Sequence, residues 1–330
     1  MRKATMRAIQ IVAPGRPEFV EIPAPEAKPG FGLVRPLLIA LCGSDVRSVY
    51  YAPAAEYPLA ATRGGHEIIA RIEALGSPAP GLQAGQIVLA LSPGDMGMAE
   101  YFATPVENLL PLPEGKPLEH LLMAQQLGTV IYGCKRLPNI IGMDAVVIGQ
   151  GSVGLFFDAM LRRLGADRVI AMDVVDARVE AGRRFGATHA FNNSRTDALS
   201  AVKAITNGRL ADLVVEAAGE PETINMMASL VRERGFILSF GLLHGPHTIP
   251  FDYYNLYRKT CALLSMGGGT ANEPGRKSVR QALDLIARGE IDVSGMVTHR
   301  FPFDRVKDAY EMARTRADGA IKVVVEMPKV

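Results

Sequence analysis

The sequence predicts a two-domain α/β protein, with a doubly wound parallel sheet in one domain and a mainly β second domain. Short β-rich runs separated by Pro and Gly fill residues 1–113, which favours an irregular, mostly antiparallel sheet. Over residues 121–266 apolar strands alternate with helices, the pattern of a parallel sheet covered on both faces. We expect the first domain to comprise residues 1–125 and 267–330, and the second to comprise residues 126–266.

The expected elements follow from apolar periodicity and turn residues. In the first stretch the strands are expected at 6–12, 31–40, 67–75 and 86–91. In the alternating stretch they are expected at 144–149, 168–173, 187–192, 211–219, 235–241 and 261–266. An amphipathic helix is expected after the first of these six strands, ending at Gly165. After Gly267-Gly268-Gly269 we expect helices at 278–289 and 303–315 and a strand at 321–327.

The composition excludes several classes of protein. Lys plus Arg number 36 against 34 Asp plus Glu, so no net charge attracts nucleic acid or an anionic membrane. No apolar run approaches the roughly 18 residues of a spanning helix, and the N-terminus lacks the apolar core of a signal peptide. The scattered Cys42, Cys134 and Cys261 do not form a disulfide framework. A cytoplasmic protein without nucleic-acid or membrane partners is expected.

A glycine motif marks the dinucleotide-binding part of the chain. The strand AVVIG runs into Gly149, Gly151 and Gly154, spaced as G-x-G-x-x-G, and a helix follows at once. In a Rossmann unit these glycines permit a tight turn, close approach of a pyrophosphate and close helix–strand packing. Ser152 and Val153 open the helix, whose N-terminus offers unpaired N–H groups to phosphates. The motif alone is weak, but strand, helix and second strand surround it here.

The cofactor is predicted to be NAD. Asp173 ends the second strand, about 20 residues beyond the loop, where an acidic side chain binds the adenosine ribose hydroxyls. A carboxylate there repels the 2′-phosphate of NADP. Arg178 is expected to flank the adenine or to pair locally.

Two motifs upstream carry side chains that bind metals. Residues 42–45 read Cys-Gly-Ser-Asp and residues 64–67 read Gly-Gly-His-Glu, which together offer a thiolate, an imidazole and carboxylates. Either motif alone is weak, because a lone Cys or His is more often structural. Together with Ala-Glu-Tyr at 99–101, the glycine loop and Gly-Ala-Ile-Lys at 319–322, they make the chain resemble the medium-chain, zinc-dependent alcohol and polyol dehydrogenases over nearly its whole length.

The resemblance implies a GroES-like catalytic domain that holds one catalytic zinc. It places Cys42 and His66 among the zinc ligands, with Glu67 behind the metal and able to move in as a ligand. Ser44 would hand the substrate proton onward, and Asp45 would support the ligand histidine.

Three further residues match family positions near the cofactor. Thr129 corresponds to a residue that packs against the nicotinamide ring. Gly219 and Lys322 correspond to positions close to the cofactor.

The sequence departs from the family pattern in two places. The third zinc ligand, usually Glu, Cys or Asp, aligns with Gln125, whose amide oxygen is a weaker ligand. Either Glu67 contributes or the site is less occupied. The lobe that holds a structural zinc in many relatives corresponds to residues 91–100, which contain no cysteine. We therefore expect a tight turn there and no structural zinc.

The implied activity is hydride transfer between the secondary CH–OH group of an alcohol or polyol and NAD. Family members assemble through the edge of the cofactor-domain sheet, which implies a homodimer or homotetramer. Candidates for the substrate pocket are Tyr50, Tyr51, Tyr57, Glu100 and residues near Leu243.

Two other functions remain open from the sequence. A metal-free reductase of quinones or activated double bonds is one, although such relatives lack the Cys and His pair. An NAD-binding sensor that has lost catalysis is the other, and Gln125 is the residue that favours it.

Overall fold

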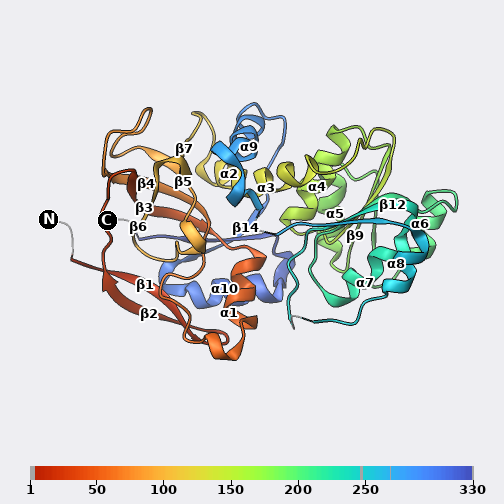
Figure 1. Cartoon of the computed structure of the whole chain (residues 1–330), viewed down its shortest axis with the longest axis horizontal. Helices are drawn as coiled ribbons and strands as arrows, with labels where there is room; N and C mark the ends of the chain where they lie inside the picture. Colours follow the sequence, from red (N-terminus) through yellow and green to blue (C-terminus); the bar gives the residue numbers. More distant parts are fainter. Residues whose placement is uncertain (1–3, 246–247, 268, 329–330) are drawn as a thin grey trace. The chain divides into compact units, whose positions relative to one another are not determined.

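The computed structural model describes residues 4–245, 248–267 and 269–328, so Gly268 of the glycine cluster lies outside the described residues. The chain forms two compact units. The first comprises Met1–Gly128 and Glu273–Val330, and the second comprises Thr129–Asn272. Figure 1 labels many of the helices and strands described below.

The first unit is built on a mixed sheet that is mostly antiparallel. Its strand order is β14-β15-β3-β4-β5-β7, and β6 also pairs with β3. Only β14 and β15 pair in parallel. The strands are β3 (Phe31–Ala40), β4 (Glu67–Leu75), β5 (Ile87–Ala90), β6 (Phe102–Pro105), β7 (Leu109–Pro111), β14 (Val297–Pro302) and β15 (Lys322–Glu326). The strand β15 thus lies beside the end of β3, which also pairs with β4 along most of its length and with β6 near its start.

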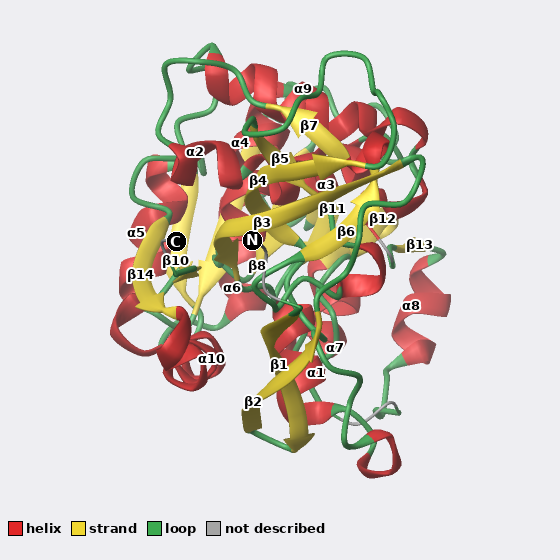
Figure 2. Ribbon diagram, turned by 90° about the vertical axis from the view of Figure 1, so that its left-hand side faces the viewer, coloured by secondary structure: helices red, strands yellow, loops and turns green. Residues whose placement is uncertain are grey.

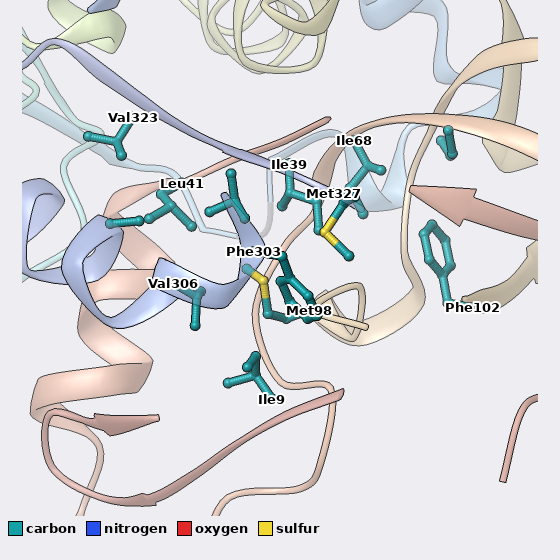
Figure 3. Packing of buried hydrophobic residues seen from close by; sticks show 14 of the residues in the cluster. Ile9, Ile39, Leu41, Ile68, Met98, Phe102, Phe303, Val306, Val323 and Met327 are labelled. Carbon is teal, nitrogen blue, oxygen red and sulfur yellow. The ribbon is translucent and has the colours of Figure 1, made fainter. Parts of the chain in front are cut away.

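An antiparallel ribbon of β1 (Thr5–Ala13) and β2 (Arg16–Pro23) completes the β structure of this unit, and Figure 2 shows it apart from the larger sheet. The helices are α1 (Gly43–Tyr51), α2 (Leu118–Leu122), α9 (Lys277–Ala287) and α10 (Val306–Thr315). In α10, Val306, Ala309 and Tyr310 are buried at the i, i+3, i+4 spacing of one helical face. They join a core that includes Ile39, Ile68 and other side chains of the sheet (Figure 3).

The second unit is a doubly wound parallel sheet. Its strands are β8 (Asp144–Ile148), β9 (Arg168–Asp173), β10 (His189–Asn192), β11 (Ala211–Glu216), β12 (Val231–Ser239) and β13 (Ala262–Ser265). All pairs are parallel, in the order β10-β9-β8-β11-β12-β13. Counted from β8 this is the 3-2-1-4-5-6 strand order of dinucleotide-binding sheets. Between β8 and β11 the chain changes the side of the sheet on which it adds its next strands, which makes this the switch point. Ligands bind at the carboxyl ends beside that point.

Helices connect the parallel strands. They are α4 (Ser152–Arg163), α5 (Asp176–Arg184), α6 (Ala198–Ile205), α7 (Pro221–Leu230) and α8 (Tyr253–Lys259). A further helix, α3 (Ala124–Cys134), precedes β8, and the boundary between the two units falls within it. The strands β8 and β11 are buried along their whole length, as expected for central strands covered on both faces.

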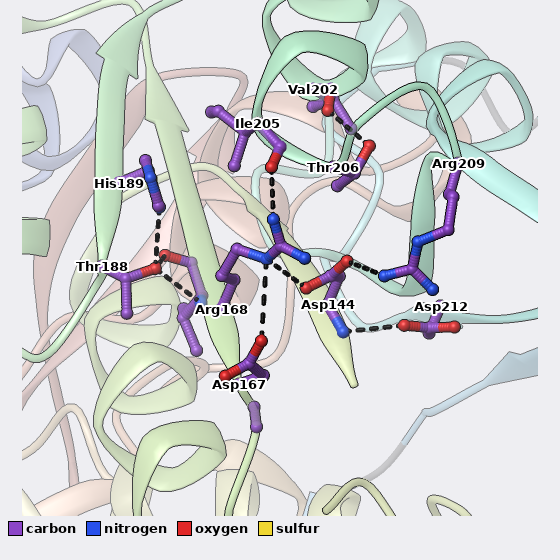
Figure 4. Close-up of polar contacts among 12 residues, drawn as sticks. Asp144, Asp167, Arg168, Thr188, His189, Val202, Ile205, Thr206, Arg209 and Asp212 are labelled. Carbon is purple, nitrogen blue, oxygen red and sulfur yellow. Dashed lines mark hydrogen bonds and ion pairs between the residues drawn. The ribbon is translucent and has the colours of Figure 1, made fainter. Parts of the chain in front are cut away.

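An ion-pair network ties together the amino ends of the strands (Figure 4). The fully buried Asp144 carboxylate accepts hydrogen bonds from Arg168 Nε at 2.6 Å and from Arg209 at 2.8 Å. The Asp144 backbone N–H donates to Asp212 Oδ2 at 2.8 Å, and Asp212 also pairs with Arg232. These charges satisfy one another at the end of the sheet opposite the glycine loop.

The fold predicted from the sequence is confirmed: a doubly wound parallel sheet accompanied by a mainly β unit. Among the described residues, no helix is both long enough and apolar enough to cross a membrane.

Candidate functional site

The two metal-binding motifs meet in the first unit because β3 and β4 are antiparallel neighbours. Ala40 at the end of β3 pairs with Glu67 at the start of β4. Cys42 follows β3 and precedes α1, while His66 directly precedes β4. The ligand atoms of Cys42, His66 and Glu67 consequently lie within 4.8 Å of one another.

The donor set fits a zinc ion. Two ligand atoms on one zinc are at most roughly 4.4 Å apart, because Zn–S is about 2.3 Å and Zn–N about 2.1 Å. Thiolate, imidazole and carboxylate are the zinc donors of proteins. Small side-chain movements would bring the Cys42, His66 and Glu67 atoms into that range.

The charges of this group favour a bound cation. Burial by itself lowers the pKa of His66, but the Cys42 side chain and the Asp45 charge outweigh it and raise that pKa well above its usual value. Burial raises the pKa of the Asp45 carboxyl, an effect that His66 partly opposes. A positive charge is therefore stabilised here, whether a proton on His66 or a metal ion among the three ligands.

Asp45 connects the two loops that carry the ligands. Its Oδ2 accepts the Cys42 N–H at 2.8 Å, and its Oδ1 accepts the Gly65 N–H at 2.9 Å. His66 Nδ1 lies 4.0 Å from Asp45 Oδ1, beyond hydrogen-bond distance. Asp45 thus acts on the histidine through its charge and through the backbone of the two loops, without a direct hydrogen bond.

Glu67 is fully buried and accepts hydrogen bonds from residues outside the two motifs. Lys322 Nζ donates to both its carboxylate oxygens, at 3.0 and 2.8 Å, and also to Leu41 O at 3.3 Å. Gln126 Nε2 donates to Glu67 Oε1 at 3.4 Å. Lys322, predicted near the cofactor, thus pairs with Glu67, one of the three candidate metal ligands. Gln125, which precedes Gln126 and was predicted as the third ligand, is half-buried in the first turn of α3.

Ser44, predicted to move the substrate proton, and Thr129, predicted to pack against the nicotinamide ring, belong to different units. Ser44 lies in the first turn of α1, and its Oγ is buried with no hydrogen-bond partner among the described residues. Thr129 begins the second unit within α3, where a Cβ on Gly269 would come within 3.0 Å of its methyl group.

The glycine loop has the geometry that its motif predicts. Gly149 has φ +91°, a left-handed conformation that favours glycine. A Cβ on Gly154 would lie 1.8 Å from the Gly149 carbonyl oxygen, so only glycine allows α4 to pack this closely against β8. A Cβ on Gly151 would meet no protein atom within 4 Å, which leaves open space beside the loop. Ser152 begins α4, followed by the half-buried Val153.

Asp173 holds this loop in place. Its Oδ2 accepts the Gln150 N–H at 2.7 Å and its Oδ1 accepts the Val175 N–H at 2.9 Å. The side chain is 8% exposed at the carboxyl end of β9. Arg178, predicted to flank the adenine, is buried within α5.

Gly219 lies in the turn after β11, across the switch point from the glycine loop. Its φ is +75°, and a Cβ there would lie 2.1 Å from the Leu242 carbonyl oxygen. Glu216 Oε1 supports the turn by accepting the Gly219 N–H at 2.8 Å.

The tyrosines considered for a substrate pocket have structural partners. Tyr50 OH donates to Glu311 at 3.0 Å. Burial, and to a smaller extent this hydrogen bond, raises the pKa of Tyr50 to about 12. Tyr57 OH donates to the Ser48 carbonyl at 3.3 Å. Similarly, Glu100 accepts hydrogen bonds from the backbone N–H and the guanidinium of Arg7.

Sequence reasoning missed Gln126, and it missed the pairing of Lys322 with Glu67. One signal was available: a lysine that opens the apolar run KVVVE of β15 needs a buried partner. No local pattern marks Gln126, because its contact with Glu67 joins residues 59 positions apart.

Two known domain families match the chain. The alcohol dehydrogenase GroES-like domain matches residues 28–114, and the zinc-binding dehydrogenase domain matches residues 152–288. Among solved structures, the fold is similar to an alcohol dehydrogenase of Escherichia coli complexed with NADH (TM-score 0.81, 23% identity, 98% and 100% of the two chains). It is also similar to a Sinorhizobium meliloti protein described as a zinc-binding dehydrogenase and bound to NADP (TM-score 0.82, 21% identity, 98% and 100% covered).

Similar sequences span nearly the whole chain. An alcohol dehydrogenase of Cupriavidus necator is 29% identical over 98% of this chain and 99% of its own length. A sorbitol dehydrogenase of Bacillus subtilis is 25% identical over 92% of each chain. With both domain families matched in order, the chain belongs to the zinc-dependent medium-chain dehydrogenase family.

Proposed function

We propose that this protein is a zinc-dependent dehydrogenase that transfers hydride between the secondary CH–OH group of an alcohol or polyol and NAD. The observation that carries the proposal is the grouping of Cys42, His66 and Glu67 within 4.8 Å, in a chain whose second unit has a dinucleotide-binding loop. The alcohol and sorbitol dehydrogenases similar to this chain support the substrate class.

One catalytic zinc would be held by Cys42 and His66, with Glu67 and Gln125 as further ligands. Lys322 neutralises Glu67, so binding of Glu67 to the metal requires the carboxylate to loosen its contact with that ammonium. We propose no structural zinc, because residues 91–100 contain no cysteine and form the tight turn η2 (Pro93–Asp95).

The proposed cofactor is NAD rather than NADP. Asp173 presents a carboxylate at the carboxyl end of β9, where the adenosine ribose binds in this fold. A 2′-phosphate would meet that negative charge. Gly151 leaves room for the pyrophosphate, and the N-terminus of α4 would supply N–H donors to it. The proposed cofactor site also includes Thr129, Ser152, Val153, Arg178 and Gly219.

The chain's own residues would orient the substrate and move one proton. Zinc, when bound, would make the substrate hydroxyl more acidic, and the nicotinamide would accept the hydride. Ser44 Oγ, buried and without a partner among the described residues, would relay the hydroxyl proton, accepting it while donating its own O–H proton to a ribose hydroxyl of the cofactor. Asp45 would keep the Cys42 and His66 loops at a constant separation through its two backbone hydrogen bonds.

We propose a homodimer or homotetramer in the cytoplasm. The strand β13 is the edge of the parallel sheet, and Leu263 on it is 45% exposed. An edge strand with exposed apolar side chains is stabilised by pairing with a second copy.

The decisive experiment measures NADH formation across secondary alcohols, polyols, sugars and amino alcohols, with metal analysis of the same preparation. Turnover that disappears on zinc removal and returns with zinc supports the proposal. Turnover that survives complete zinc removal contradicts it and favours a metal-free reductase. Tight NADH binding without turnover on any substrate favours a sensor.

A further inference from the structure

A second carboxylate, outside both metal-binding motifs, lies beside the histidine of the zinc site. Asp95 Oδ1 is 3.5 Å from His66 Nδ1, closer than the 4.0 Å that separates His66 from Asp45. Both oxygens of Asp45 already accept backbone N–H groups, so Asp45 has less capacity to bind the imidazole. Asp95, by contrast, is half-exposed, with 52% of its side chain accessible.

The backbone holds Asp95 in this position. Gly64 N donates to the Asp95 carbonyl at 2.6 Å, and Gly97 N donates to the Gly64 carbonyl at 2.8 Å. Ser92 Oγ donates to the Gly65 carbonyl at 2.6 Å. The segment 92–97 is therefore hydrogen-bonded at three points to the segment that carries His66.

A histidine that binds zinc through one ring nitrogen usually donates the N–H of the other nitrogen to a nearby acceptor. Because Nδ1 lies toward Asp95 and Asp45, Nε2 is the nitrogen available to Cys42 and the metal. A neutral imidazole that binds through Nε2 carries its proton on Nδ1, and an acceptor for that proton fixes the tautomer and the ring orientation. Shortening the 3.5 Å separation by about half an ångström would give an ordinary hydrogen bond.

We propose that Asp95 is a positioning residue for the zinc ligand His66, accepting the Nδ1 proton and holding Nε2 toward the metal. The inference rests on the zinc site proposed above. It assigns a role to the short turn that stands where many relatives are expected to carry a cysteine lobe. Loss of such a partner lowers metal affinity by about 10- to 100-fold.

The test uses Asp95→Gly, because Asp95 has φ +56° and glycine accepts this conformation without strain. Asp95→Asn is the conservative variant, since its amide oxygen can still accept the Nδ1 proton. The matched control is Asp318→Gly, which removes an exposed aspartate at φ +51° that has no part in the proposed site. Thermal unfolding of the zinc-free proteins establishes that each variant folds.

The measurement is zinc affinity by competition with a chromophoric chelator, followed by the visible spectrum of the Co²⁺-substituted protein. We expect Asp95→Gly to bind zinc about 10-fold more weakly and to shift the Co²⁺ bands, because an imidazole without its partner reorients. Asp95→Asn should recover most of the affinity, and Asp318→Gly should match the wild type. Unchanged affinity and spectrum in Asp95→Gly would overturn this inference alone. A wild-type protein that binds no zinc would overturn it together with the proposed function.

Discussion

Lys322 and Glu67 form an ion pair in the interior of the first unit, with the Lys322 ammonium 2.8 Å from Glu67 Oε2 and each side chain 1% exposed. The sheet brings them together, because Ala40 of β3 pairs with Glu67 on one side and with Val324 of β15 on the other. The strand β15 thereby supplies the cation that pairs with a carboxylate beside the proposed metal site.

Removing one partner of this pair should destabilise the protein strongly. Lys322→Met leaves the Glu67 carboxylate buried without its cation, and loss of one partner of a buried pair costs about 3–5 kcal/mol. Lys322→Met combined with Glu67→Gln should cost less than Lys322→Met alone, because no uncompensated charge remains. Urea unfolding of zinc-free protein measures both. The exposed pair Arg305 and Asp308 is the control, and its disruption should change stability little. Equal losses in the single and double variants would argue against charge burial as the cause.

Two glycines of the cofactor loop should respond differently to the same change. A Cβ at Gly154 meets the Gly149 carbonyl at 1.8 Å, so Gly154→Ala must displace the loop or α4 and lower the unfolding temperature. A Cβ at Gly151 meets no protein atom within 4 Å, so Gly151→Ala should fold normally yet bind NADH more weakly. Calorimetry and NADH fluorescence titration separate these effects. Normal NADH affinity in Gly151→Ala would place the pyrophosphate elsewhere.

The three cysteines should differ in reactivity toward an alkylating reagent. Burial raises the pKa of the Cys134 thiol to about 12, so at pH 8 it holds almost no thiolate, the reactive form. Burial also raises the pKa of Cys261. Cys42 should be protected while zinc is bound and should become labelled after chelation. Peptide mass mapping after iodoacetamide treatment, with and without chelator, checks this order. Labelling of Cys42 at the same rate in both states would show that no metal covers it.

Asp158 in α4 should make stability depend on pH. The carboxyl is fully buried, and burial raises its pKa well above the usual 3.8, an effect that the Gln150 side chain partly opposes. A raised pKa in the folded state means that the folded protein keeps the proton more tightly than the unfolded chain. The stabilisation that the protonated Asp158 carboxyl provides is therefore fully present at pH values below the pKa of the unfolded chain. It is lost as the pH rises through the pKa of this carboxyl in the folded protein.

Asp158→Asn removes that ionisation. Urea unfolding between pH 5 and pH 9 should show a smaller fall in stability with rising pH for the variant than for the wild type. At pH 9 the variant should be the more stable of the two. Asp284→Asn, on the surface of α9, is the control and should follow the wild type. A variant curve parallel to the wild-type curve would contradict the assignment of the pH dependence to Asp158.

The local sequence pattern was sufficient to predict the central strands and the glycine loop. The strands β3, β4, β8 and β9 are where apolar runs bounded by Gly and Pro predict them, and all six parallel strands were expected. By contrast, β2 and β14 carry no such run. The strand β2 contains Pro17 and is mostly exposed, and β14 alternates partly buried and exposed residues in a short polar sequence. These strands exist because a neighbour supplies the hydrogen bonds.

The sequence by itself determined the type of fold, the glycine-rich motif and the residue types at Cys42 and His66 that we propose to hold zinc. These follow from side-chain chemistry and from periods of two to four residues, which are visible along the chain. Only the tertiary structure decided which charges surround those ligands. Lys322 reaches Glu67 across 255 positions, and Asp95 reaches His66 from a separate turn. Such contacts depend on strand register and loop docking, which arise from packing of the whole unit.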